Sequence, residues 1–199
     1  MKKLIMFAAV AALAFASQAA SVDWEIAAKS WTMSDGSKPN GATVYLFDTT
    51  ASGYSDFVAA LTGGTLGDSI SASTITSAAG YVDSATTYSS TKATLLNVNY
   101  GKVSTTTSTI SGEEGVRAFS VIVLDGQNYK VASTTTGTVY TNPDDASTAL
   151  FTSVQMSAGT WAEYTAAGGG GGGGTDVPEP TSGLLLVIGG AMLALRRRR

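Results

Sequence analysis

The sequence of 199 residues contains no histidine and no cysteine. These two absences exclude Ser-His-Asp triads, Cys-His pairs, zinc sites built from His and Cys, haem ligation and iron–sulfur clusters. They also exclude disulfide bonds, so the folded chain has to be stable through packing alone. Any catalysis would have to use carboxylates, lysine, tyrosine or hydroxyl groups. We expect no cofactor and no metal, and we expect that the protein is not an enzyme.

Positive charge is scarce in the middle of the chain. Of the twelve Lys and Arg residues, two lie within the first three residues and four are the last four residues. Between Ser21 and Asp176 the remaining six cations face fourteen Asp and Glu, which gives this part a net charge near −8. Because such a surface repels phosphate groups, neither nucleic acid nor an anionic membrane face is an expected partner.

The N-terminal residues have the organisation of a secretory signal peptide. Two lysines follow Met1, an apolar stretch runs from Leu4 to Ala16, and Ser17-Gln18-Ala19 supplies the small residues that signal peptidase needs. A buried N-terminal helix is the alternative, but it would require neither the lysines nor the small residues. We expect signal peptidase to remove residues 1–19, with the cut between Ala19 and Ala20.

The C-terminal residues 177–199 combine three physically different segments in a fixed order. Pro178-Glu179-Pro180 is held extended, because each proline fixes φ and lacks an amide hydrogen. The uncharged run 183–195 would span about 20 Å as a helix, whereas the hydrocarbon core of a bilayer is about 30 Å thick. It is followed by Arg196, Arg197, Arg198 and Arg199, which favour the cytoplasmic side and place the body of the protein outside that membrane.

This order of segments resembles the PEP-CTERM sorting tail of exported bacterial proteins. The resemblance implies that an exosortase, an integral membrane cysteine protease, recognises Pro178, Glu179 and Pro180 and processes the tail. It also implies a cell envelope with an outer membrane and an association with exopolysaccharide or biofilm. A short membrane anchor or a disordered apolar tail are the alternatives, and neither requires Pro-Glu-Pro. The resemblance covers about an eighth of the chain and implies nothing about the body.

Between the two ends we expect one domain and a flexible linker. The domain would be residues 20–165, and the linker 166–176 contains seven consecutive glycines. From Ser21 to Thr165 there are 21 Ser and 25 Thr. This abundance favours solvent-facing strand positions, where β-branched Thr is common, over O-linked glycan sites or disorder.

Short apolar runs separated by turn residues predict a mainly β fold: a single β-sandwich or jelly-roll-like domain with one short helix, flanked by the signal peptide and a C-terminal hydrophobic helix. The helix is predicted from Ser55, as N-cap, to Leu61, with a stop at Gly63-Gly64. The first strand, 22–28, also fits a helical pattern. The strands are predicted at 22–28, 42–47, 69–76, 81–88, 93–103, 116–124, 129–133, 149–156 and 160–164. Asp125-Gly126 predicts a hairpin turn between the strands 116–124 and 129–133.

Two kinds of candidate site remain. The adjacent acids Glu113-Glu114 and Asp144-Asp145 could be a glycosidase pair or calcium ligands, but solvated turns are the preferred interpretation. Trp24, Trp31 and Trp161, with Tyr164, could form a platform that stacks on sugar rings, although such residues are more often core.

Taken together, these features predict a non-enzymatic surface or extracellular-matrix protein that is exported through the inner membrane and held there by its tail. An exosortase-type protease would then process it, and the body would be released or transferred outward. A secreted carbohydrate-binding module that uses exposed Trp and Tyr is the alternative, and a carboxylate enzyme is a third.

Overall fold

The structure, a computed structural model, describes residues 20–142, Met156 and residues 159–167. These residues belong to one compact unit that ends at Ala167. The expected signal peptide, the Asp144-Asp145 pair, the glycine run and the sorting tail lie outside the described residues, as does the expected strand 149–156 except for Met156. Among the helices that are described, none has the length and apolar character needed to cross a bilayer.

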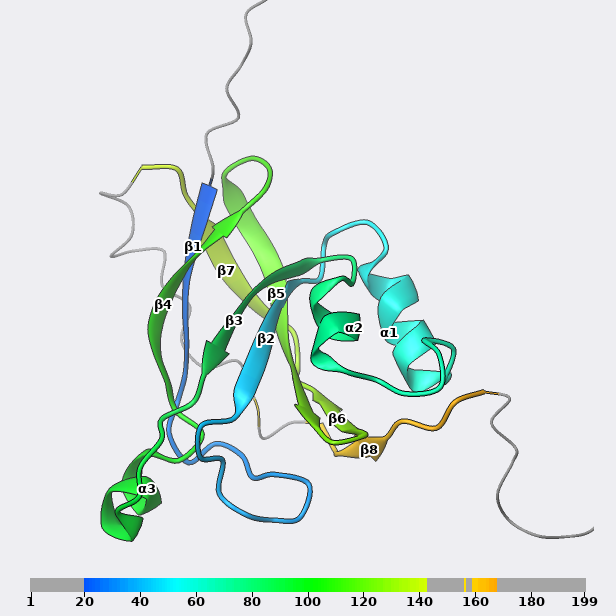
Figure 1. The fold of residues 1–199 in the computed structure, drawn as a ribbon. Coiled ribbons are helices and arrows are strands. Elements are labelled where there is room, and N and C mark those ends of the chain that lie inside the picture. The colour runs from blue at the N-terminus through cyan, green and yellow to red at the C-terminus, as the bar shows by residue number, and fades with distance from the viewer. Residues whose placement is uncertain (1–19, 143–155, 157–158, 168–199) are drawn as a thin grey trace, which may run out of the picture. The chain divides into compact units, whose positions relative to one another are not determined.

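The body consists of two antiparallel sheets, as expected for a mainly β sandwich (Figure 1). In the smaller sheet β1 (Ala20–Ile26) pairs with β4 (Val103–Ile110). The larger sheet has the order β3-β2-β5-β6-β8, and β7 pairs with β5. Its strands are β2 (Thr43–Asp48), β3 (Tyr81–Thr86), β5 (Gly115–Asp125), β6 (Asn128–Val131), β7 (Thr135–Val139) and β8 (Ala162–Glu163).

Period-two alternation along the central strands gives the larger sheet two apolar faces. On β2, Val44 and Leu46 pack toward the β1–β4 sheet, whereas Tyr45 and Phe47 pack toward the helices. Figure 1 shows α1 and α2 on one side of β2 and β5, with β1 and β4 on the other. The body is therefore a sandwich with a helical layer on its outer face. The core between the sheets includes Trp24, Ile26, Phe119 and Val121, and the core beneath the helices includes Phe57, Leu61, Ile75 and Ile122.

The two sheets are joined at one edge and open at the other. At the joined edge Ser21 and Tyr140 exchange backbone hydrogen bonds of 2.7 and 2.9 Å. At the open edge β3 and β4 form no strand pairing with each other. Side chains bridge them instead: Ser108 Oγ on β4 donates to Asp83 Oδ2 on β3 at 2.8 Å. The edge between β3 and β4 is thus where the sandwich has room for a pocket.

The predicted helix is confirmed, but its N-cap is not. The helix α1 (Tyr54–Thr62) ends at Gly63, as expected. It begins after Gly53, which has φ 89°, and no side chain caps it. The predicted cap at Ser55 is wrong because the chain turns two residues earlier, where glycine adopts the left-handed conformation without strain.

The strands predicted at 69–76 and 93–103 are wrong. Residues Ala72–Thr76 form α2, which begins with a capping box between Ser71 and Thr74. Residues Ala93–Asn99 form α3, which has no side-chain cap. The described part of the chain therefore contains three helices and not one. In the Ser- and Thr-rich segment of α2, hydroxyl groups of Ser71 and Ser77 bond to the local backbone, and this outweighs a weak period-two pattern.

Six of the other described strands overlap the predicted ranges, whereas β4 (Val103–Ile110) and β7 (Thr135–Val139) were not predicted. The segment beginning at Val22 is strand β1 and not the alternative helix, and β2, β3 and β5 lie where predicted. The predicted hairpin after β5 is also confirmed: Asp125 pairs with Asn128 across a two-residue turn. Gly126 in that turn has φ 63°, a conformation that glycine adopts readily.

Candidate functional site

A pocket with a cavity volume of about 340 Å³ lies at the open edge of the sandwich. It is formed where β2 ends, β3 begins and β4 ends. This volume falls at the lower end of the range for small-molecule sites, about 300–1,000 Å³. The residues that line it are Asp48, Ala51, Gly80, Tyr81, Val82, Thr109, Ile110 and Ser111.

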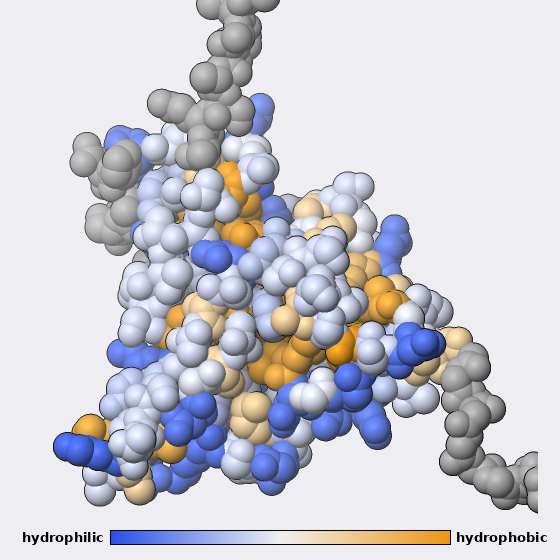
Figure 2. Space-filling view, in the orientation of Figure 1, coloured by the Kyte–Doolittle hydropathy of each residue, from blue (hydrophilic) through white to orange (hydrophobic). Residues whose placement is uncertain are grey.

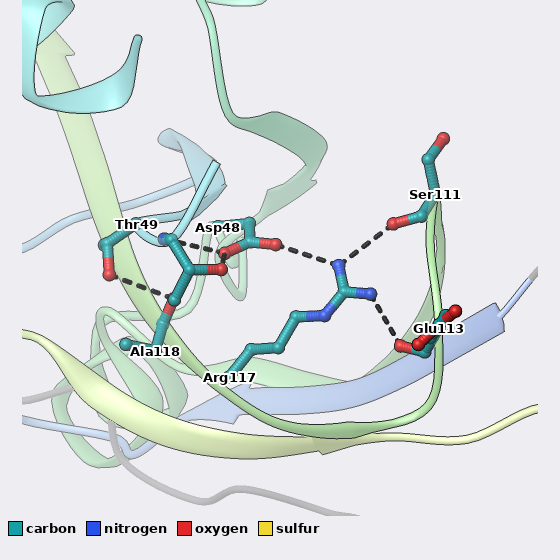
Figure 3. Close-up of polar contacts among 7 residues, drawn as sticks. Asp48, Thr49, Ser111, Glu113, Arg117 and Ala118 are labelled. Atoms are coloured by element: carbon teal, nitrogen blue, oxygen red, sulfur yellow. Dashed lines mark hydrogen bonds and ion pairs between the residues drawn. The ribbon is translucent and has the colours of Figure 1, made fainter. Parts of the chain in front are cut away.

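An ion pair between Arg117 and Asp48 forms beside this pocket. Arg117 Nη1 on β5 lies 3.0 Å from Asp48 Oδ2, and the two side chains are 18% and 7% exposed. The guanidinium also donates to the backbone carbonyls of Ser111, at 2.9 Å, and Glu113, at 2.6 Å (Figure 3). Arg117 therefore holds the turn between β4 and β5 against the end of β2.

The Asp48 carboxylate is fully engaged in local structure. Its Oδ1 accepts hydrogen bonds from the Thr50 backbone N–H at 2.8 Å and from Thr50 Oγ1 at 2.5 Å. Its Oδ2 accepts from Arg117. Among the described residues that line the pocket, Asp48 is the one that carries a charge, and both of its oxygens already have donors. The pocket offers hydroxyl and carbonyl groups, but no activated nucleophile with an adjacent base.

The Glu113-Glu114 pair lies in the exposed turn between β4 and β5. Glu114 Oε1 accepts from the Thr141 backbone N–H at 2.7 Å and from the Thr141 hydroxyl. These hydrogen bonds lower the pKa of Glu114 from its ordinary value. A glycosidase general acid needs a raised pKa, so the geometry favours a solvated turn over catalysis. Among the residues that the structure describes, no group of three acidic side chains could hold a metal ion.

Two of the three tryptophans proposed as a sugar platform are buried. Trp24 is 0% exposed, and its Nε1 donates to Ser108 Oγ at 2.8 Å. Trp31 is 4% exposed, and its Nε1 donates to the Gly101 carbonyl at 3.1 Å. Neither ring has a free face, so the prediction that they contact glycans is wrong. Their bulk fills the core between the two sheets, which sequence spacing could not show.

Trp161 and Tyr164 belong to the last part of the described body. Trp161 is partly buried, and its ring centroid lies 6.4 Å from that of Trp31. Tyr164 is 5% exposed, and its hydroxyl donates to the Gly67 carbonyl at 2.7 Å. Tyr164 is therefore core. The glycan role of Trp161 stays a prediction, but Trp161 has no exposed aromatic partner among these residues.

Lys130 is a buried charge that the sequence did not reveal. It lies on β6, is 6% exposed, and burial lowers the pKa of its ammonium group from 10.5. Within the described residues no carboxylate lies within ion-pair distance of it. The charged form is disfavoured in the fold, so Lys130 lowers stability at any pH below its folded pKa.

Replacing Lys130 with Met is expected to raise the free energy of unfolding by about 1 kcal/mol at neutral pH, because the fold disfavours the charged form of this lysine and the substitution removes that charge while keeping the stem volume. Urea denaturation at pH 7 and pH 10 checks this. The gain should shrink as the pH rises through the lowered pKa, since the wild-type lysine then becomes neutral. Lys92→Met, at an exposed position, is the control, and an equal effect there would contradict the prediction.

No family model, curated protein or solved structure matches this chain.

Proposed function

We propose that this chain is a non-enzymatic bacterial surface or extracellular-matrix protein whose C-terminal tail is a sorting signal. In this role the signal peptide directs export, the tail holds the body at the outer face of the inner membrane, and an exosortase-type protease then processes the tail. The mature body would become part of the cell surface or of an exopolysaccharide matrix.

The observation that carries the proposal is the order of segments in residues 177–199. Each segment would have its own role at the membrane. The extended Pro178-Glu179-Pro180 step would be recognised by the protease, the short apolar run would enter the bilayer, and the four arginines would stay on the cytoplasmic side. The run is too short to span a bilayer comfortably, which suits a segment that is held briefly and then cut.

One feature of the body supports a non-catalytic role. The charged groups nearest the pocket, Asp48 and Arg117, are engaged in holding the fold together. The alternative of a carbohydrate-binding module loses its main support, because Trp24 and Trp31 are buried.

Replacing Pro178, Glu179 and Pro180 together with alanine in the full chain is expected to block processing, because the extended recognition segment is lost. Mass spectrometry of the protein made in its own bacterium would then find residues up to Arg199 on the variant but not on the wild type. Alanine at Thr175, Asp176 and Val177 changes three neighbouring residues and serves as the control. A variant cut like the wild type, or wild-type protein outside the cell with Arg199 intact, would sink the proposal.

A further inference from the structure

The helix α3 presents an apolar surface that no described part of the body covers. None of its residues is buried, and Leu95 and Val98 are 44% and 49% exposed. A seven-residue helix is not stable alone in water. Its C-terminal end is anchored by two hydrogen bonds: the Lys29 backbone N–H donates to the Tyr100 carbonyl at 2.8 Å, and Trp31 Nε1 donates to the Gly101 carbonyl. Contacts with distant residues therefore stabilise a helix that has no buried side chain of its own. An exposed apolar helix of this kind is typical of an interaction surface.

The cations of the body gather around this helix. Lys38 Nζ donates to Asn97 Oδ1 and lies 5.6 Å above the Tyr100 ring. Lys92 is the N-cap of α3 and Lys102 follows its end. With Lys29, four of the six Lys and Arg residues between Ser21 and Asp176 lie here, and the sequence from 84 to 112 contains no acid. Figure 2 shows apolar and strongly hydrophilic residues side by side over α3. We call this surface the basic pole: Lys29, Lys38, Lys92, Leu95, Val98 and Lys102.

A surface of opposite charge lies at the other end of β4. The turn between β4 and β5 exposes Glu113 and Glu114, and Val116 beside them is 73% exposed. The eight residues of β4 separate this turn from α3 by about 25 Å. Arg117 does not neutralise the turn, because its charge is paired with Asp48. We call Glu113, Glu114 and Val116 the acidic pole.

We propose that the basic pole of one copy of this protein docks on the acidic pole of the next. The basic pole carries Leu95 and Val98 beside four lysines, and the acidic pole carries Val116 beside two glutamates, so the two are complementary in both respects. An anionic lipid surface would explain the lysines but would leave the exposed Val116 and the two glutamates unused. Because the two surfaces differ, each added copy leaves one pole free, and the assembly grows head to tail as a filament.

This inference deepens the proposed function, since it describes how a matrix protein would build a matrix. Tail processing and assembly are measured separately, so either one can fail alone. If the tail is cut but the protein does not assemble, only the filament proposal is contradicted. If the protein assembles but its tail is not cut, only the sorting proposal is contradicted.

The absence of cysteine makes site-specific cross-linking clean. The full chain carrying both Val98→Cys and Val116→Cys, treated with a bismaleimide in non-ionic detergent and low salt, is expected to give a ladder of dimers, trimers and larger species. Chains with either cysteine alone are expected to stay monomeric. The control pair is Val98→Cys with Ala59→Cys, an exposed position on α1. Efficient dimers from Val98→Cys alone would indicate contact between two α3 helices and would overturn the proposal, as would the lack of a ladder.

Charge reversal in the cross-linking background tests the direction of assembly. Lys92→Glu with Lys102→Glu should abolish the ladder by breaking the basic pole, and Glu113→Lys with Glu114→Lys should do the same at the acidic pole. A mixture of these two chains should give dimers and nothing larger, because each retains one working pole. A ladder unaffected by reversal contradicts the proposal. A second result would also contradict it: phosphatidylglycerol vesicles protect the Val98→Cys thiol from maleimide labelling while the protein stays monomeric. That result would assign the basic pole to a membrane.

Discussion

Replacing Trp24 with alanine is expected to lower the free energy of unfolding by about 3–5 kcal/mol. Trp24 is the largest of the fully buried side chains of the body and packs between the two sheets. Its removal loses the burial of the indole and leaves a cavity in a core that has no disulfide to hold it. A domain of this size has a stability of about 5–15 kcal/mol. The loss should therefore be visible in urea denaturation followed by circular dichroism.

Smaller changes at the same place should separate packing from hydrogen bonding. The Trp24 indole donates to Ser108, which donates to Asp83, so these three side chains connect β1, β4 and β3. Ser108→Ala leaves the buried indole N–H without an acceptor and should cost about 1–3 kcal/mol. Ser104→Ala, at an exposed position on the same strand, is the matched control and should change stability by less than about 0.5 kcal/mol. Equal effects at Ser108 and Ser104 would show that the bridge between the sheets does not contribute.

Replacing Asp48 with alanine is expected to lower the free energy of unfolding by about 2 kcal/mol. Three hydrogen bonds disappear, and the Arg117 guanidinium loses its counter-charge while it stays tied to the β4–β5 turn. Breaking a fully buried ion pair costs about 3–5 kcal/mol, and the partial exposure of Arg117 reduces this figure. Urea denaturation measures the change. Hydrogen exchange in the turn at residues 111–115 should also become faster, since its anchor is weakened.

A double-mutant cycle with Arg117→Met shows whether Asp48 acts through Arg117. The double variant should be little less stable than Asp48→Ala alone, because the unpaired charge is gone. Asp68→Ala, which removes an exposed acid, controls for the change in net charge. If Asp68→Ala is as destabilising as Asp48→Ala, then the ion pair does not contribute.

Long apolar patterns predicted the fold better than short ones did. The run that became β5 contains several β-branched and aromatic residues in succession and was assigned correctly, as was the Asp125-Gly126 turn. The segment around Ile75 contains few apolar residues among Ser and Thr, and the apolar residues of Ala93–Asn99 follow no clear period. Their helical state depends on a capping box at Ser71 and on contacts from residues 29 and 31 to the end of α3. Contacts of the second kind cannot be read from local sequence.

The candidate sites show the same limit. Charge and turn residues predicted that Glu113-Glu114 would be a solvated turn, and it is. Trp24 and Trp31 were offered as a platform, but whether a tryptophan faces solvent depends on which strands cover it. The buried Lys130 has no signature in a sequence where lysines ordinarily lie on the surface.

The sequence alone determined the mainly β character, the export-like ends, the excess of acid and the classes of chemistry that the chain cannot perform, because composition and periodicity act residue by residue. Only the tertiary structure decided which strands leave an edge open, which aromatic side chains fill the core and how four lysines come together at α3. These depend on segments distant in sequence, such as residues 29, 38 and 92–102, and their meeting is settled by packing and by hydrogen bonds across the fold.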